Sequence, residues 1–159
     1  APSAIVAGLK DARLIGRFQR LSWQHKQVIL DVAHNPQAAQ NLALELGKET
    51  CEGRTIAVLA MLSDKDYQQV IAALANSFDH WMLANSTGAR ALSCYELAQE
   101  VALHGVAATQ IDTFSSPMQA FEAAIDKATE ADRVIVFGSF VTVGAVLASV
   151  STEASQAQA

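Results

Sequence analysis

Short runs of apolar residues, separated by longer amphipathic stretches, dominate the sequence. Four of these runs are rich in valine, isoleucine or leucine and have the length of strands buried in a parallel sheet. They cover residues 27–31, 55–60, 80–84 and 133–138. A weaker run at 109–114 predicts one more strand, and residues 15–22 predict a short antiparallel strand at an edge of the sheet.

Between the predicted strands, apolar residues recur at the three- and four-residue spacing of helices. This spacing predicts a helix after each of the first three runs, another over residues 117–129, and a last one from Phe140 to Val150. The dipeptides Asn35-Pro36 and Ser116-Pro117 each place a capping side chain before a proline at the first helical position. The alternation predicts a doubly wound α/β fold, with a mostly parallel sheet of about five or six strands and helices on both faces.

The length of 159 residues fits one domain of this kind. We expect residues 1–14 to be a linker or an entering helix, residues 15–150 to form the α/β domain, and residues 151–159 to be a polar, frayed tail. The chain begins without Met and without the pattern of a signal peptide, so we expect a fragment of a longer protein.

Charge and hydropathy exclude several classes of function. The chain has 11 Lys and Arg against 16 Asp and Glu, a net charge of −5, which argues against a nucleic-acid or anionic-membrane partner. Its apolar runs are too short to span a bilayer. Its two cysteines, Cys51 and Cys94, form neither a disulfide framework nor a zinc motif. There is also no GxGxxG and no GxxxxGK[ST], so the chain contains no phosphate-binding loop.

Polar residues that follow the predicted strands are the candidates for chemistry, because ligands of open parallel sheets bind at the carboxyl ends of strands. After the first long run come Asp31, His34 and Asn35. A carboxylate there can accept hydrogen bonds from ribose hydroxyls, and the imidazole and amide can meet a base or a sugar. The structural alternative is that Asp31 caps the turn, Asn35 caps the helix and His34 is merely exposed.

Three further residues are weaker candidates. Lys65 lies at a predicted helix start, where a cation opposes the helix dipole, so it faces either a phosphate or only solvent. Arg17, in Gly16-Arg17-Phe18, can offer a bidentate guanidinium to phosphate oxygens. Ser139 follows the last predicted strand at the same edge of the sheet.

Four segments together carry a resemblance to a known family. They are GRF at 16–18, DVAHNP at 31–36, AMLSDKD at 60–66 and VIVFGSFVTVGAVL at 134–147. In this order and spacing, the chain resembles over residues 3–150 the C-terminal domain of bacterial bifunctional dihydrofolate synthase/folylpolyglutamate synthases, in the Mur-ligase superfamily. One departure is Ile15, which stands where that family usually has a proline before Gly-Arg-Phe.

The resemblance implies a cytoplasmic, ATP-dependent ligase of folate biosynthesis. Such an enzyme phosphorylates dihydropteroate or folate to an acyl phosphate, which the amine of L-glutamate attacks to form an amide. ATP and Mg²⁺ are then held mainly by an N-terminal P-loop domain of the same parent chain, which would be the partner of this domain. The 159-residue chain alone is accordingly expected to be inactive.

The family resemblance also implies roles for single residues. Arg17 matches a linker arginine that faces the ATP phosphates, Asp31 an acid near the ribose, and His34 with Asn35 a turn that contacts the nucleotide. Lys65 matches a basic, catalytic position near the phosphates or the incoming amino acid. For Ser139 the resemblance implies a place beside bound glutamate, and no residue of this chain is expected to ligate a metal.

Two other functions remain open at this point. A Mur-type ligase acting on a cell-wall precursor would share a turn like DVAHNP, whereas MLSDKD and GSF favour the folate enzymes. A stand-alone receiver-like binding module would share the alternating α/β pattern. That module needs an acidic pair at one strand end and a lysine late in the chain, and neither accompanies Asp31 or Ser139.

Overall fold

The computed structural model describes residues 17–157, so the expectation for residues 1–14 lies outside the described part of the chain. Its centre is a six-stranded sheet in the order β1-β2-β6-β3-β4-β5. The strands are β1 (Gln19–Trp23), β2 (Lys26–Asp31), β3 (Thr55–Leu59), β4 (His80–Ala84), β5 (Ile111–Phe114) and β6 (Arg133–Phe137). All neighbours are parallel except β1 and β2, which confirms the predicted mostly parallel sheet and its antiparallel edge strand.

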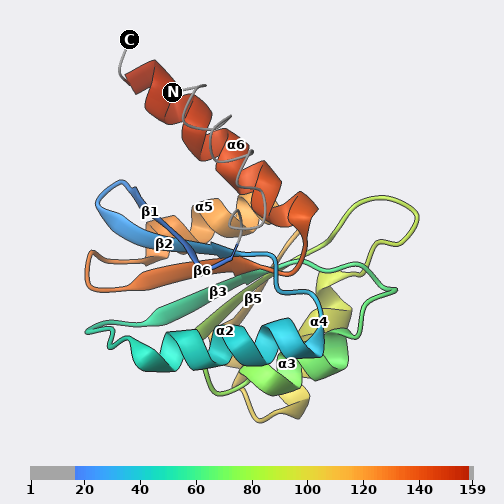
Figure 1. Cartoon of the computed structure of the whole chain (residues 1–159). Helices are drawn as coiled ribbons and strands as arrows, with labels where there is room; N and C mark the ends of the chain where they lie inside the picture. Colours follow the sequence, from blue (N-terminus) through green and yellow to red (C-terminus); the bar gives the residue numbers. More distant parts are fainter. Residues whose placement is uncertain (1–16, 158–159) are drawn as a thin grey trace.

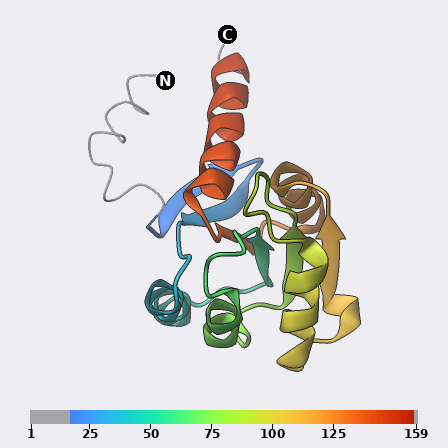
Figure 2. The same cartoon turned by 90° about the vertical axis from the view of Figure 1, so that its right-hand side faces the viewer.

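Helices cover both faces of the sheet, as predicted (Figure 1). On one face lie α2 (Pro36–Lys48), α3 (Tyr67–Leu74) and α4 (Cys94–Leu103), which bury apolar side chains against one side of the strands. On the other lie α5 (Pro117–Lys127) and α6 (Phe140–Ala157). Figure 2 shows the two layers edge-on, with the long α6 rising from the sheet. Across residues 17–157, every helix is too short or too polar to cross a bilayer.

Several element boundaries differ from the sequence prediction: the edge strand is Gln19–Trp23 instead of 15–22, and α5 ends at Lys127 instead of residue 129. Two further differences concern α6 and β5. The helix α6 continues to Ala157, so the polar segment after Val150 extends this helix over residues 151–157. The segment 108–110 forms a short 3₁₀ helix, so β5 starts at Ile111 and not at residue 109 as predicted. Polar sequence can continue a helix because intrinsic propensity is sufficient once a buried segment has nucleated it.

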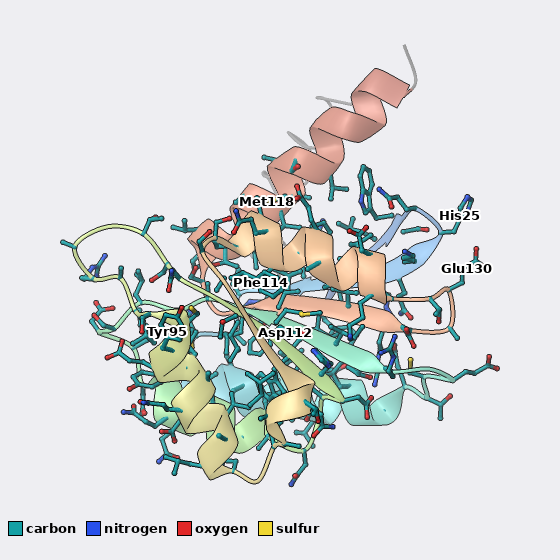
Figure 3. All side chains as sticks on the ribbon, turned by 180° about the vertical axis from the view of Figure 1, so that it is seen from behind. His25, Tyr95, Asp112, Phe114, Met118 and Glu130 are labelled. Carbon is teal, nitrogen blue, oxygen red and sulfur yellow. The ribbon has the colours of Figure 1, made fainter. Side chains whose placement is uncertain are left out.

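The hairpin that joins β1 and β2 turns through Gln24 and His25, whose φ angles are 51° and 63°. Two successive residues with positive φ match the right-handed twist of the flanking strands. Figure 3 shows His25 at this turn, on the side of the molecule where Met118 marks α5. The hairpin fixes the register in which Gln19 faces Leu30, so the residues before β1 are carried back beside the carboxyl end of β2.

The position of β6 between β2 and β3 creates the opening at which a site can form. Helices α2 and α3, which follow β2 and β3, pack on one face of the sheet. Helix α6, which follows β6, packs on the opposite face. Adjacent strands whose following helices diverge define the switch point at which open α/β sheets bind ligands.

At the amino end of the central strand β6, Asp132 and Arg133 are buried with relative exposures of 3% and 7%. Oδ1 of Asp132 accepts a hydrogen bond of 2.6 Å from the Arg54 amide, and Oδ2 accepts one of 2.8 Å from the Thr129 amide. The Arg54 guanidinium also pairs with Oδ2 at 3.1 Å. Arg133 donates to the carbonyl of Leu46 at 3.2 Å, at the carboxyl end of α2, where a positive charge is favourable.

We expect Asp132 to make the stability of the chain depend on pH. Burial acts to raise the pKa of this carboxyl, but the hydrogen bonds from Thr129 and Arg54 and the Arg54 charge outweigh it, and its pKa is lowered. Its stabilisation is therefore complete above the unfolded-state pKa of about 3.9 and is lost as pH falls through the lower folded-state pKa. Asp132→Asn should lower the free energy of unfolding by about 1–3 kcal/mol at neutral pH.

Denaturant unfolding of the wild type and of Asp132→Asn at about pH 7 and about pH 2.5 measures this effect. The difference between the two proteins should shrink at the lower pH. Asp126→Asn, at an exposed position of α5, is the control and should behave like the wild type at both pH values. A difference for Asp132→Asn that is the same at both pH values would contradict the assignment.

Candidate functional site

A cavity of about 530 Å³ opens at the carboxyl end of β2. Three segments that are distant in sequence line it: the residues before β1, the turn and helix that follow β2, and the first residue of α6. Of the candidate residues named from the sequence, the structure brings Arg17, Asp31, His34 and Asn35 together here. Lys65 and Ser139 lie outside the lining of this cavity.

Asp31 ends β2 and joins the two sides of the cavity. Its Oδ2 accepts a hydrogen bond of 3.0 Å from the Phe18 amide, and its Oδ1 accepts one of 2.9 Å from the Ala33 amide. Phe18 has a φ of 48°, an unfavourable value for a non-glycine residue, and its bond to Asp31 helps to hold this conformation. Burial raises the pKa of Asp31, while these two hydrogen bonds and the charge of Arg17 oppose the rise. The carboxylate thus fixes the turn and still lines the cavity.

His34 presents one ring nitrogen to the cavity region. Its Nδ1 lies 2.7 Å from the carbonyl oxygen of Val32, which can only accept, so Nδ1 carries the proton. Nε2 is then the acceptor of the neutral ring, or a second donor when the ring is protonated. The aromatic ring of Phe140 lies 6.1 Å from the His34 ring, centroid to centroid, and is itself 65% exposed. The apolar ring of Phe140 therefore lies beside the imidazole of His34.

Asn35 is the N-cap of α2. Its Oδ1 accepts a hydrogen bond of 2.8 Å from the Ala38 amide, and Pro36 occupies the first helical turn, as the Asn-Pro pair predicts. This geometry matches the capping alternative considered for Asn35. Through it, Asn35 fixes the direction of α2 and so the wall of the cavity.

Arg17 is exposed and lies directly before the strained Phe18. It lines the cavity close enough to Asp31 for its charge to act on the pKa of that carboxyl. An exposed guanidinium at the rim of a cavity is free to bind phosphate oxygens in a bidentate way.

Lys65 lies in the connection between β3 and α3, at the carboxyl end of a strand that pairs with β6 and β4 but not with β2. The loop from residue 85 to 93 braces this connection. Ser63 donates a backbone hydrogen bond of 2.8 Å to Arg90, and the Arg90 guanidinium pairs with Asp64 at 2.7 Å. The hydrogen bond from Arg90 lowers the pKa of Asp64.

Ser139 begins α6 as a capping residue. Its Oγ accepts a hydrogen bond of 3.0 Å from the Thr142 amide and also lies 3.0 Å from Thr142 Oγ1. The residue before it, Gly138, has a φ of 119°, and a Cβ added there would overlap the carbonyl oxygen of Ala60. Ser139 is therefore placed where β6 meets the end of β3, close to the connection that carries Lys65.

Among the described residues, no three His, Cys, Asp or Glu side chains are grouped to hold a metal ion. At the cavity, both oxygens of Asp31 already accept backbone hydrogen bonds. The described residues therefore provide no complete metal site of their own.

Several further side chains line the cavity although the sequence assigned no role to any of them. They are Phe140 at the start of α6 and Gln37, Asn41 and Glu45 on α2. The three α2 residues recur at a spacing of four, which places them on one face of the helix. That spacing is visible in the sequence, but only the fold shows that this face borders a cavity.

The model of the family described as "Mur ligase, glutamate ligase domain" matches residues 16–140. A dihydrofolate synthase/folylpolyglutamate synthase of Escherichia coli (strain K12) is 38% identical over 145 residues, which are 91% of this chain and 32% of that protein. The chain thus spans about a third of the length of the relatives it matches.

Solved structures agree. The structure of E. coli FolC in complex with DHPP and ADP superimposes with a TM-score of 0.80 and 35% identity, covering 96% of this chain and 35% of that chain. A bifunctional folylpolyglutamate synthase/dihydrofolate synthase with Mn, AMPPNP and L-glutamate bound gives a TM-score of 0.77 and 38% identity, covering 87% and 32%. Sequence motifs, sheet topology and these matches lead to one assignment: the chain belongs to the Mur ligase family as a glutamate ligase domain.

Proposed function

We propose that this chain is the C-terminal domain of an ATP-dependent amide ligase that adds L-glutamate to dihydropteroate or folate. The observation that carries the proposal is the cavity at the switch point, where Arg17, Asp31 and His34 converge from separate segments. Support comes from relatives named dihydrofolate synthase/folylpolyglutamate synthase and from similar structures that hold ADP, or AMPPNP with L-glutamate.

In the proposed reaction, a carboxylate oxygen of the folate substrate attacks the γ-phosphorus of ATP, and ADP leaves. The amine of L-glutamate then attacks the carbonyl carbon of the acyl phosphate, phosphate leaves, and the amine loses a proton. The positive charge of Arg17 binds phosphate oxygens and stabilises the negative charge that develops on them. Asp31 accepts a hydrogen bond from a ribose hydroxyl. His34 contributes its Nε2 to the nucleotide.

Lys65 and Ser139 are proposed to serve the incoming glutamate rather than the nucleotide. They lie outside the cavity at the ends of β3 and β6, which are neighbours in the sheet. The ammonium of Lys65 can pair with a glutamate carboxylate, and the hydroxyl of Ser139 can donate to one. This arrangement would place glutamate beside the phosphate end of the nucleotide.

Catalysis needs a second domain in this proposal. The sequence has no Walker-type phosphate loop, and the described residues group no metal ligands. A separate P-loop domain, in the part of the parent chain that the relatives possess, would supply the loop and hold Mg²⁺. The chain alone should then fold but bind ATP with a dissociation constant no tighter than about 1 mM.

Amide NMR spectra of the isolated chain, recorded with increasing ATP, test the nucleotide part of the proposal. Shifts should concentrate at residues 17–18 and 31–35, and no phosphate should be released when folate and glutamate are added. His34→Ala should weaken the shifts, while His104→Ala, at the exposed C-cap of α4, serves as the control. Shifts that avoid this cavity, or turnover by the isolated chain, would overturn the proposal.

A further inference from the structure

Thr142 carries a buried hydroxyl in the first turn of α6. The residue is 2% exposed, and its neighbours at positions 141, 143 and 146 are all valines. Valine has nearly the shape of threonine, and a hydroxyl that is buried without a hydrogen-bond partner destabilises a protein. Packing alone would therefore be served as well by valine, and the role of Thr142 lies in what its hydroxyl contacts.

Two oxygen atoms lie within hydrogen-bond distance of Thr142 Oγ1. The Oγ of Ser139 is 3.0 Å away, and the carbonyl oxygen of Ala60 is 3.4 Å away. The Thr142 amide also donates to Ser139 Oγ, at 3.0 Å. Thr142 thus holds Ser139 Oγ through both its backbone and its side chain. A serine that caps a helix needs only the amide contact, so the hydroxyl contact is an addition to ordinary helix capping.

Ala60 is the point at which the start of α6 meets the segment that follows β3. Gly138 permits this close approach, because a Cβ at that position would overlap the carbonyl oxygen of Ala60. Lys65 follows in the same connection, between β3 and α3. The hydroxyl of Thr142 therefore links the segment that carries Ser139 to the segment that carries Lys65, the two residues proposed to serve glutamate.

The hydroxyl of Ser139 has one proton to donate and two lone pairs that accept. The Thr142 amide occupies one lone pair. When the Thr142 hydroxyl donates to Ser139, it occupies the second lone pair, and only the proton of Ser139 is left for a ligand. When the Thr142 hydroxyl donates to Ala60, Ser139 donates to Thr142 and keeps only a lone pair for a ligand. A carboxylate can only accept hydrogen bonds, so its binding selects the first arrangement.

We propose that Thr142 is a positioning residue for the incoming glutamate, and that it acts by fixing Ser139 as a hydrogen-bond donor to a carboxylate of that substrate. The inference rests on the proposed function, because it needs glutamate beside Ser139. Thr142 acts through Ser139 and need not touch the substrate. Its methyl group has no part in this role, so serine can replace threonine here, whereas valine cannot.

Initial rates of a full-length ligase that contains this domain, measured first at varied L-glutamate and then at varied ATP, test this role. Thr142→Val should raise the KM for glutamate about three- to tenfold, the effect of one neutral hydrogen bond, and should leave kcat and the KM for ATP unchanged. Thr142→Ser should restore the KM for glutamate. Thr113→Val, at an exposed position of β5 on the far edge of the sheet, is the matched control and should have no effect.

A double-mutant cycle with Ser139→Ala distinguishes this role from a purely structural one. In the Ser139→Ala background, Thr142→Val should no longer change the KM for glutamate, because the residue through which Thr142 acts is already lost. The inference would be overturned by an effect that persists in that background, by a raised KM for glutamate in Thr142→Ser, or by an equal rise in the KM for ATP in Thr142→Val.

Ser139→Ala by itself separates this inference from the proposed function. If Ser139→Ala raises the KM for glutamate and Thr142→Val does not, the role of Thr142 is wrong and the place of Ser139 stands. A KM for glutamate that is unchanged in Ser139→Ala would overturn the part of Ser139 in the proposed function, and the role of Thr142 with it.

Discussion

Replacing Gly138 by alanine is expected to destabilise the isolated chain by about 3 kcal/mol or more. The residue has a φ of 119°, and an added Cβ would lie 2.2 Å from the carbonyl oxygen of Ala60 and 2.8 Å from Leu59 Cδ1. Backbone strain and overlap therefore act together, at the junction of β6 with α6. For a chain of this length, the midpoint of thermal unfolding should fall by about 10 °C.

Gly144→Ala provides the matched control for this substitution. Gly144 lies within α6, and nothing stands within 4 Å of the Cβ that alanine would add. The change should be neutral or stabilise the helix by up to about 1 kcal/mol. Calorimetry of the three proteins measures both effects. If Gly138→Ala melted at the temperature of the wild type, the close approach of β6 to the end of β3 would be wrong.

Arg17→Lys is expected to reduce kcat/KM by about 10- to 150-fold in a ligase that contains this domain, equivalent to about 1.5–3 kcal/mol. Lysine keeps the positive charge but loses the planar, bidentate donor set that matches phosphate oxygens. A suitable enzyme is a chimera in which this chain replaces the matching third of the E. coli relative. Initial rates at varied ATP concentration measure the effect.

Arg20→Lys is the control for Arg17→Lys in the same chimera. Arg20 is also exposed and lies three residues away, but it pairs with Glu49 and does not line the cavity. Its substitution should leave kcat/KM unchanged. Normal turnover by the Arg17 variant would reduce Arg17 to a linker residue with no part in phosphate binding.

The pattern of the sequence is sufficient to predict the strands and helices, because each buried strand of a parallel sheet is apolar on both faces. The runs around Val28, Val58 and Val136 are fully buried in this way. The order of the strands in the sheet cannot be predicted in this way. The position of β6 between β2 and β3 depends on how distant surfaces pack together, and no local sequence pattern encodes it.

Some residues of the candidate site can be predicted from the sequence and others cannot. Asp31 and His34 can be singled out because they follow a predicted strand, and a parallel sheet brings the carboxyl ends of its strands to one side. The separation of Lys65 from the cavity and the part played by Phe140 depend on the path of the chain through space. For Asn35, the Asn-Pro pair predicts the capping hydrogen bond that the structure shows. The same pair carries no information on whether Asn35 contacts a ligand.

We expect this domain to support glutamate ligation only together with a P-loop domain. Phosphate release by the chimera can be measured with ATP, Mg²⁺ and dihydropteroate in the presence and absence of L-glutamate. Release should depend on glutamate in the chimera, and the isolated chain should release no phosphate under the same conditions. Glutamate-dependent release by the isolated chain, or a folded chimera that binds ATP but releases no phosphate with glutamate, would contradict it.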